Sequence, residues 1–269
     1  MNAIPNVMTI AGSDSGGGAG IQADLKTIFA LGGYGTSAIT ALTAQNGAEV
    51  TGIFPVSPDF VVEQITTIAK GFPLKAAKTG MLFSADIIVA VANALQKRTY
   101  PLVVDPVSIS QSGYTLLEES AIDALKRELL PQSDLLTPNI PEAEMLSGIH
   151  LTDKESIFAA GEALLKTVQG AVLIKGGHTE GTIMIHDYLF QKGNSPKELP
   201  VLRIDTNNTH GTGCTLSAAI ATGLAKGLPL LIAVTKAQEY LNEALRKSYT
   251  PGIGHGPVNH ACRLSLSHS

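Results

Sequence analysis

Short apolar segments alternate with helical segments through almost the whole of this chain, and this alternation limits the folds that it can adopt. The clearest apolar segments are rich in β-branched or aliphatic residues and lie at 7–10, 36–45, 101–105 and 171–177. Between the first two, Ile21, Leu25 and Ile28 recur at helical spacing until a glycine pair ends the segment. Strands separated by helices favour a mainly parallel sheet with helices on both faces, so the sequence predicts an α/β fold.

The remaining segments continue the same alternation. Ser57, Pro58 and Asp59 have the order of a helix cap, a first helical residue and a first-turn acid, and Ser84 can cap the next helix. Further helices are expected at about 118–130, 141–148, 153–168, 214–227 and 232–247. Further strands are expected at 75–80, 134–137, 182–190 and 201–204. Because no linker-like tract interrupts these segments, we expect one domain over residues 1–269.

The composition argues against several classes of protein. The net charge is -4 and no run of lysine or arginine occurs, so we expect neither nucleic acid nor an anionic membrane as a partner. Cys214 and Cys262 are the only cysteines, too few for a disulfide framework or a cysteine zinc site. No apolar stretch approaches the ~18 residues of a membrane span, and the first residues lack the pattern of a secretion signal. These features predict a soluble cytoplasmic protein.

Polar residues follow most of the expected strands. They are Gly12 to Asp14, Gln45, Asn46, Lys78, Thr79, Asp105, Asn139, Glu142, Lys175 and Thr206 to Cys214. In open parallel sheets, ligands bind beyond the carboxyl ends of the strands. Amides, carboxylates, lysines and glycine turns at that edge suit the binding of phosphate and amide groups. We therefore expect the functional site there.

The segment "NTHGTGCTLSAA" places Gly211 and Gly213 before an alanine-rich helix that is expected to begin at Cys214. Glycines let backbone N–H groups approach a ligand, and the positive end of a helix attracts an anion, although an ordinary capped helix explains the same residues. A helix N-terminus also lowers the pKa of a thiol. Cys214 is thus a covalent nucleophile, a proton acceptor or only a small buried residue. His178 and His210 are candidate partners for the thiol.

Two further motifs carry candidate ligands for a metal or a phosphate. "TPNIPE" places Asn139 and Glu142 around a strand-to-helix turn, where an amide and a carboxylate can orient the waters of Mg²⁺, but a plain helix start explains the same letters. Lys175 after its strand either places a positive charge on a phosphate or keeps the strand end soluble. Asp24, one turn into a helix, has the pattern of a solvated face. The loop at 16–20 matches neither the dinucleotide fingerprint nor the P-loop.

Several motifs in combination resemble one enzyme family. They are "TIAGSDSGGGAGIQADLKT", "TALTAQN", "KTGML", "TPNIPEAEML", "LIKGGH" and "NTHGTGCTLSAA". Together they resemble the bacterial hydroxymethylpyrimidine/phosphomethylpyrimidine kinases of thiamine biosynthesis, which belong to the ribokinase-like superfamily. The resemblance implies a three-layer α/β fold, a homodimer and two successive phosphoryl transfers from ATP with Mg²⁺. The first goes to the hydroxymethyl group of 4-amino-5-hydroxymethyl-2-methylpyrimidine, and the second goes to the resulting monophosphate.

The same resemblance implies roles for individual residues. Those implied for binding the pyrimidine are Gln45, Asp24, Gly12 and Met81. Those implied for binding ATP are Lys175, Thr209, Gly211, Thr212 and Gly213. Those implied for the metal and phosphate side are Glu142, Asp105 and Asn139, and those implied for catalysis are Cys214, Gly211, Gly213 and Lys175. A glutamine suits an aminopyrimidine because its amide offers a donor and an acceptor in one plane.

The cysteine departs from the pattern of the related sugar kinases. Many of them resemble "GAGD" where this chain has "GTGC", and the aspartate is their base. An aspartate would repel the anionic phosphate that attacks in the second reaction. A thiol with a lowered pKa could still accept the proton of the alcohol in the first. We therefore hypothesise that Cys214 lets one site serve a neutral and an anionic nucleophile.

A polar, glycine-containing segment at 108–116 is expected to form a lid over the bound ligands. Such a lid would exclude water, which would otherwise hydrolyse ATP without transfer. We expect it to become ordered when both ligands bind.

Three other functions remain open from the sequence. The first is a pyridoxal kinase of the same superfamily, against which Met81 and Gln45 favour the pyrimidine. The second is a nucleotide-binding regulatory or scaffold protein without turnover. The third is a hydrolase that forms a covalent adduct on Cys214.

Overall fold

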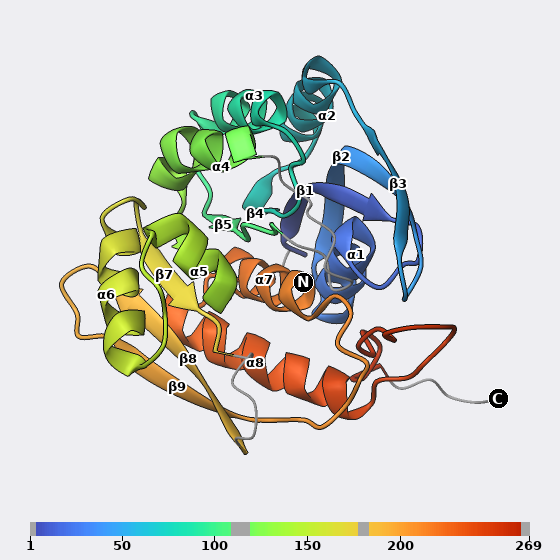
Figure 1. Cartoon of the computed structure of the whole chain (residues 1–269). Coiled ribbons are helices and arrows are strands. Elements are labelled where there is room, and N and C mark those ends of the chain that lie inside the picture. Colours follow the sequence, from blue (N-terminus) through green and yellow to red (C-terminus); the bar gives the residue numbers. More distant parts are fainter. Residues whose placement is uncertain (1–3, 109–118, 177–182, 265–269) are drawn as a thin grey trace.

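The computed structural model describes residues 4–108, 119–176 and 183–264, and these residues build a nine-stranded sheet (Figure 1). The strands are β1 (Asn6–Asp14), β2 (Tyr34–Gln45), β3 (Val50–Pro55), β4 (Leu74–Thr79), β5 (Leu102–Val104), β6 (Leu135–Leu136), β7 (Ala171–Ile174), β8 (Met184–Gln191) and β9 (Lys197–Leu202). Their order across the sheet is β3-β2-β1-β4-β5-β6-β7-β8-β9. The strands from β2 to β7 in this order are parallel, whereas β3, β8 and β9 pair in the antiparallel sense. The predicted mainly parallel α/β sheet is confirmed.

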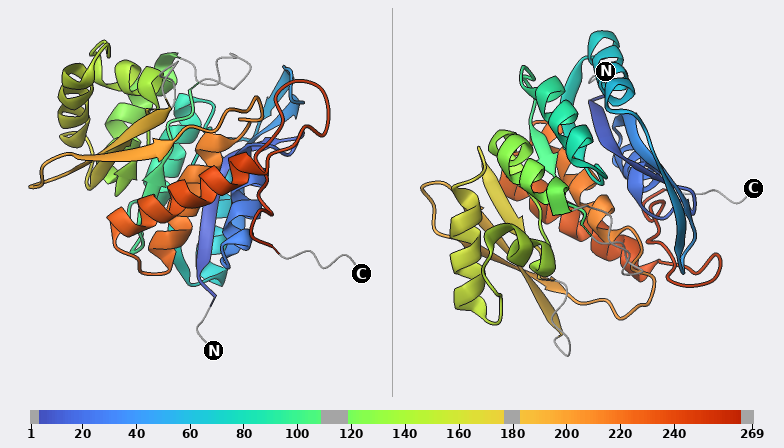
Figure 2. Two further views of the ribbon diagram at one scale, coloured as in Figure 1. Left: turned by 90° about the horizontal axis from the view of Figure 1, so that it is seen from below. Right: turned by 45° about the horizontal axis from the view of Figure 1, so that its top comes forward.

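Helices cover both faces of this sheet, which gives three layers (Figures 1 and 2). They are α1 (Gly20–Ala30), α2 (Pro58–Gly71), α3 (Ala85–Leu95), α4 (Glu119–Ala124), α5 (Ile140–Ser147), α6 (Lys154–Leu165), α7 (Thr212–Ala225) and α8 (Leu230–Arg246). α1, α7 and α8 lie on one face, and α2 to α6 lie on the other. Within the described ranges, no helix is both long and apolar enough to cross a bilayer.

The alternation of side chains along β1 explains why the sheet has two cores. Val7 packs into the core formed with α1, α7 and α8, whereas Met8 and Ile10 belong to the core on the opposite face. Successive side chains of a strand point to opposite faces, so a fully apolar strand buries both. α7 is buried along most of its length, from Thr215 to Gly223, and its alanines let it lie close against the sheet.

The structure differs from the sequence-based expectation in three elements. The antiparallel edge strand β3 was not predicted, because its residues are mostly exposed and carry no apolar alternation. The single helix expected at 118–130 is instead α4, a π-helical turn at Leu125–Leu129 and a 3₁₀ turn at Leu130–Gln132 that contains a proline. α7 begins at Thr212, inside the glycine turn, rather than at Cys214.

The two predicted serine caps have different outcomes. Ser84 precedes α3, and its hydroxyl accepts a hydrogen bond from the backbone N–H of Ile87 at 3.4 Å, as the sequence predicts. Ser57 stands at the cap position of α2, but its side chain makes no capping hydrogen bond. The first turn of α2 therefore depends on Pro58 and Asp59 instead.

We predict that shortening a side chain between the sheet and α3 destabilises the fold. Ile88 has 0% exposure, and its replacement by alanine should lower the free energy of unfolding by about 2–5 kcal/mol because a cavity remains. Ile232 in α8 is 41% exposed, so Ile232→Ala should cost less than about 1 kcal/mol. Urea denaturation measures both values. Equal losses in the two variants would contradict the assignment of Ile88 to the core.

Candidate functional site

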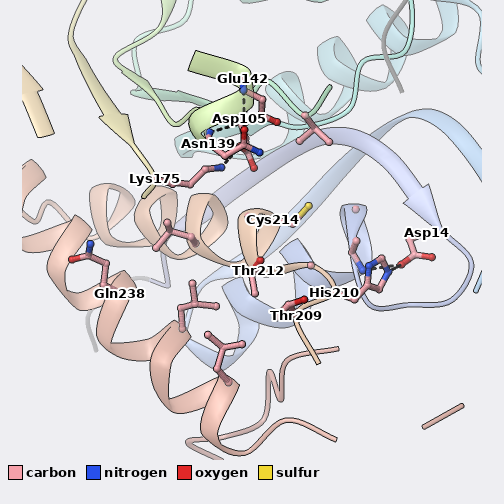
Figure 3. A pocket seen from close by; sticks show the side chains of 18 of the residues that line it. Asp14, Asp105, Asn139, Glu142, Lys175, Thr209, His210, Thr212, Cys214 and Gln238 are labelled. Atoms are coloured by element: carbon pink, nitrogen blue, oxygen red, sulfur yellow. Dashed lines mark hydrogen bonds and ion pairs between the residues drawn. The ribbon is translucent and has the colours of Figure 1, made fainter. Parts of the chain in front are cut away.

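A cavity of about 590 Å³ lies at the carboxyl ends of the parallel strands (Figure 3). Each parallel strand contributes lining residues just beyond or at its end, and these include Gly12 to Asp14, Gln45, Met81, Asp105, Asn139 and Lys175. The turn before α7 also lines the cavity, from Thr209 to Cys214. Most of the polar residues expected after the strands therefore gather at this edge, whereas Asn46, Lys78, Thr79, Asn207 and Asn208 do not line the cavity.

One end of the cavity contains the side chains implied for a flat ring. Gly12, Gln45 and Met81 all line it, and the backbone N–H of Gly12 donates to the carbonyl of Met81 at 3.1 Å. A Cβ atom at Gly12 would lie 2.5 Å from the Met81 methyl carbon, so a side chain there would require the end of this methionine to shift. The Gln45 Oε1 atom accepts from the Thr43 hydroxyl at 3.1 Å, which orients the amide. We call this end, with its one positioned amide, the slot at Gln45.

Asp24 does not belong to the lining of the cavity, which corrects both sequence-based placements of this residue. It has 0% exposure, and its two carboxylate oxygens lie 2.8 and 2.9 Å from the Lys78 Nζ atom. The Thr9 hydroxyl donates to the same carboxylate at 2.6 Å. Burial alone would lower the pKa of Lys78, but Asp24, Cys214 and Asp105 raise it above its ordinary value. The ammonium group is therefore a permanent buried charge, and the solvated-face interpretation of Asp24 is wrong.

The turn before α7 is built so that backbone N–H groups face the cavity. Gly211 has a φ of 80°, and a Cβ atom there would lie 1.9 Å from the carbonyl oxygen of Gly18. A side chain at this position would therefore force the two loops apart. The first N–H groups of a helix have no intrahelical acceptor, and here Thr212, Gly213 and Cys214 line the cavity, with the Thr212 N–H donating to the Thr209 carbonyl at 3.3 Å. This geometry suits an anion.

Lys175 provides a positive charge beside that turn, and Asp105 holds it (Figure 3). The Lys175 Nζ atom lies 3.0 Å from Asp105 Oδ1, and a Cβ atom at Gly213 would lie 3.5 Å from the same nitrogen. Ser217 donates to the other Asp105 oxygen at 3.1 Å. Burial raises the pKa of Asp105, but Lys175 and Lys78 more than offset this, so its pKa is below the ordinary value. The carboxylate thus stays charged and fixes the ammonium at the cavity wall.

Asn139 and Glu142 form a helix cap at the start of α5, and Glu142 also lines the cavity. The Asn139 side-chain oxygen accepts from the Glu142 N–H at 2.9 Å, and the Glu142 carboxylate accepts from the Asn139 N–H at 2.9 Å. The plain helix start that the sequence allowed is therefore present. Burial raises the pKa of Glu142. The cap uses one oxygen of each side chain, but Glu142 has a second oxygen, which accepts only a long bond of 3.4 Å from the Ser108 N–H, so Glu142 is the better candidate for a metal ligand.

The structure corrects the expected ionisation of Cys214. Burial raises the pKa of its thiol to about 11, although Lys78 and a hydrogen bond from the backbone of Gly20 act in the opposite direction. Desolvation therefore outweighs Lys78 and the Gly20 hydrogen bond, even though Cys214 is only half-buried at the cavity wall. The thiol is uncharged at neutral pH. The prediction of a lowered pKa is wrong.

Neither histidine that the sequence offered as a partner of the thiol is seen to pair with it in the described residues. The His210 Nε2 atom lies 2.8 Å from the carboxylate of Asp14 (Figure 3). The partner of His210 is therefore Asp14 and not Cys214. His178 lies outside the described residues, as do residues 109–116 of the expected lid. Cys262 is buried away from the lining of the cavity.

The far end of the cavity contains residues that the sequence did not single out. α8 contributes Gln238, Leu241, Asn242 and Leu245, which lie on one face at helical spacing. The Gln238 amide donates to the buried carboxylate of Asp187 at 2.7 Å. β9 and the residues after it add an apolar wall at Val201, Leu202 and Ile204. An apolar slot edged by amides suits a planar base. The spacing along α8 was the one available signal, and it is indistinguishable from an ordinary amphipathic helix.

We predict that Cys214 reacts slowly with iodoacetamide at neutral pH and faster as the pH rises. Since only the thiolate reacts and the pKa is about 11, the rate should rise about tenfold per pH unit from about pH 7 to pH 9. A Cys262→Ser background removes the second thiol, and mass spectrometry measures the rate. A rate that stops rising near pH ~8.5, the pKa of a free thiol, would contradict the effect of burial.

Comparison with known proteins gives the relatives of this chain. Residues 14–259 match the family described as phosphomethylpyrimidine kinase. A hydroxymethylpyrimidine/phosphomethylpyrimidine kinase of Rhizobium meliloti is 47% identical over 256 residues, 94% of this chain and 96% of that protein. A thiamine biosynthesis bifunctional protein of Geobacter sulfurreducens is 48% identical over 95% of this chain, which spans only 52% of that protein. Among solved structures, an ADP complex of Bacillus subtilis pyridoxal kinase has a TM-score of 0.89 at 34% identity, with 97% of this chain and 98% of that one covered.

Proposed function

This chain belongs to the phosphomethylpyrimidine kinase family, and from that membership and its cavity we propose that it acts in thiamine biosynthesis. It phosphorylates 4-amino-5-hydroxymethyl-2-methylpyrimidine with ATP and then phosphorylates the monophosphate to the diphosphate. The fold is ribokinase-like, and the enzyme is a phosphotransferase. One observation carries the proposal: the slot at Gln45 and the helix end at Gly211 to Cys214 open into the same cavity. An acceptor and a phosphoryl donor can therefore meet there.

In this proposal the two ends of the cavity bind different parts of the reacting pair. The pyrimidine lies between Gly12 and Met81 and pairs with the Gln45 amide. ATP lies along α8, with its terminal phosphate at the bend formed by Thr209 to Gly213. Lys175 neutralises the phosphoryl group in transit, and the backbone N–H groups of Gly211 and Gly213 hold it. Phosphoryl transfer depends mainly on such alignment and charge stabilisation.

We propose Mg²⁺ as the partner of ATP, and the side chains of the cavity fit that role. Among the described residues no three His, Cys, Asp or Glu side chains converge to make a metal cage. Mg²⁺ bound with ATP needs only one or two carboxylates, because phosphates and water supply its other ligands. Glu142 would hold it, with Asp105 on the same wall and Asn139 keeping Glu142 in place. When bound, the ion neutralises phosphate charge.

An uncharged thiol at Cys214 suits both acceptors in the proposed sequence of reactions. The alcohol of the first step needs no strong base, because a loose transition state develops little negative charge on the attacking oxygen. The acceptor of the second step is already an anion. A carboxylate ~4 Å from it would cost about 4 kcal/mol at an effective dielectric constant of ~20. The raised pKa of the thiol therefore supports the hypothesis of one site for two nucleophiles.

We predict that Cys214→Asp separates the two reactions. The rate with the monophosphate should fall at least about tenfold further than the rate with the alcohol, because the carboxylate repels the anionic acceptor. Cys214→Ser is the matched control, since it keeps an uncharged group and should preserve the ratio of the two rates. Steady-state assays with each acceptor under the same ATP and Mg²⁺ measure this. If the two rates fall equally in Cys214→Asp, the electrostatic explanation is wrong.

The second candidate function is that of a pyridoxal kinase, and the high structural similarity to the Bacillus subtilis enzyme favours it. Both acceptors are planar rings with a primary alcohol. The positioned amide of Gln45 favours the aminopyrimidine, because a ring that leaves the amide unpaired is penalised. The choice between the two functions therefore depends on that side chain.

We predict that the pyrimidine alcohol and its monophosphate both react faster than pyridoxal. Gln45→Leu removes the amide at nearly constant volume and should lower kcat/KM for the pyrimidine by about 10–100-fold, while ADP binding stays unchanged. ATP consumption with the three acceptors, and calorimetry with ADP, measure these effects. Faster turnover of pyridoxal, or no effect of Gln45→Leu on the pyrimidine, would favour the second function.

We also propose that the enzyme is a cytoplasmic homodimer. Leu42 and Phe54 form a cross-strand pair on β2 and β3 and are 46% and 69% exposed, which supports contact with a second copy at this edge of the sheet. ATP, the proposed phosphoryl donor, is available in the cytoplasm.

A further inference from the structure

The buried pair of Asp14 and His210 has no role in the reaction described so far, although both residues line the cavity. We propose that this pair positions the reacting groups: it holds the glycine loop at 15–20 against the bend at Gly211, and thereby sets where Cys214 and Gln45 stand relative to the migrating phosphoryl group. The kinetic part of this inference rests on the proposed kinase function. The structural part does not.

The pair is a buried hydrogen bond between an imidazole and a carboxylate. Asp14 and His210 are 3% and 7% exposed, and the His210 Nε2 atom lies 2.8 Å from Asp14 Oδ2. The backbone N–H groups of Gly18 and Ala19 donate to the same oxygen at 3.0 and 2.8 Å, and that of Gly16 donates to the other oxygen at 2.8 Å. A carboxylate can only accept, so Nε2 carries the hydrogen. Burial raises the pKa of Asp14, but these hydrogen bonds lower it by more. The pKa is therefore below its ordinary value, and the carboxylate is charged.

The two loops that the pair joins are 196 residues apart in sequence and fit tightly against each other. A Cβ atom at Gly18 would lie 2.2 Å from the His210 ring, and one at Gly211 would lie 1.9 Å from the Gly18 carbonyl oxygen. The backbone N–H of His210 donates to the carbonyl of Gly256 at 3.1 Å. His210 is thus fixed from two directions, and the loop at 15–20 is fixed through it.

The loop in turn touches both functional ends of the cavity. Ser15 exchanges two hydrogen bonds with the backbone of Gln45, at 2.8 and 2.9 Å. Gly20 provides the backbone hydrogen bond that lowers the pKa of the Cys214 thiol against the effect of burial. A displacement of the loop would therefore move the backbone of Gln45 and remove a donor from the thiol. Small displacements of this kind reduce the rate of a bound complex more than its affinity.

The Nε2 atom of His210 does not act as a base in this arrangement. That atom is used by Asp14, and its partner carboxylate is saturated by backbone donors. The role that we propose for the pair is mechanical: a buried hydrogen bond that connects the residues after β1 with the start of α7.

The test compares His210→Leu, Asp14→Asn, the double variant and His210→Gln. The first two should lower kcat for the pyrimidine alcohol by about 10–100-fold while KM for each substrate changes less than about 3-fold. The kcat of the double variant should be no lower than that of the slower single variant, because the two substitutions remove the same interaction. His210→Gln keeps an N–H donor and should recover part of the lost rate. His150→Leu, which breaks the exposed pair of His150 with Glu144 outside the cavity lining, is the matched control.

A second readout does not require turnover. In the Cys262→Ser background, losing the pair should slow the alkylation of Cys214 at a fixed pH near 9 by at least about 3-fold, because the Gly20 donor no longer favours the thiolate. Circular dichroism confirms that each variant is folded. Unchanged alkylation together with unchanged kcat overturns the proposal. A fall in kcat that only follows a fall in the folded fraction, with the alkylation of the folded protein unchanged, also overturns it. A wild-type enzyme without kinase activity but with the expected change in alkylation would contradict the proposed function alone.

Discussion

The close approach of Gly211 to the carbonyl of Gly18 determines how this site is built. It brings the residues after the first strand and the residues before α7 into direct contact, although they lie at opposite ends of the chain. The left-handed conformation of Gly211 then starts α7 with its N–H groups at the cavity wall. The sheet fixes the other participants, because parallel strands all present their carboxyl ends at the same edge. In the proposed reaction, this one contact decides whether the donor phosphate and the pyrimidine share a cavity.

The balance of charge around that bend follows from burial. Lys175 is held by Asp105, and Lys78 is held by Asp24, so each ammonium group has a carboxylate partner at 3.0 Å or less. Both pairs act on the pKa of neighbouring groups, yet the Cys214 thiol remains protonated because desolvation is the larger effect. A negative side chain at that position would have no counter-charge of its own. Because the sulfur is uncharged, it adds no repulsion to the attraction between Lys175 and the substrate phosphates.

The sequence predicted the α/β class, the parallel sheet and the edge at which the site lies, because these depend on local apolar periodicity and strand ends. It could not predict β3, whose exposed residues carry no periodic signal. It placed Asp24 in the solvent or in the substrate pocket, since a one-dimensional pattern cannot show that Lys78 lies opposite it. The pKa of Cys214 was mistaken for a similar reason: the helix end is visible in the sequence, whereas the depth of burial is not. Asp14 was noted as a strand-end residue, but its pairing with His210 exists only in the folded chain.

The central claim is that the bend at Gly211 to Gly213 holds the migrating phosphoryl group in line with an acceptor bound at Gln45. A crystal structure with ADP, fluoroaluminate and the pyrimidine alcohol tests this most directly, because planar fluoroaluminate imitates the phosphoryl group in transit. The account predicts that the fluoroaluminate accepts hydrogen bonds from the backbone of the bend, contacts Lys175 and lies between ADP and the hydroxymethyl oxygen. Fluoroaluminate bound away from the bend, or a pyrimidine bound outside the Gln45 end of the cavity, would contradict it.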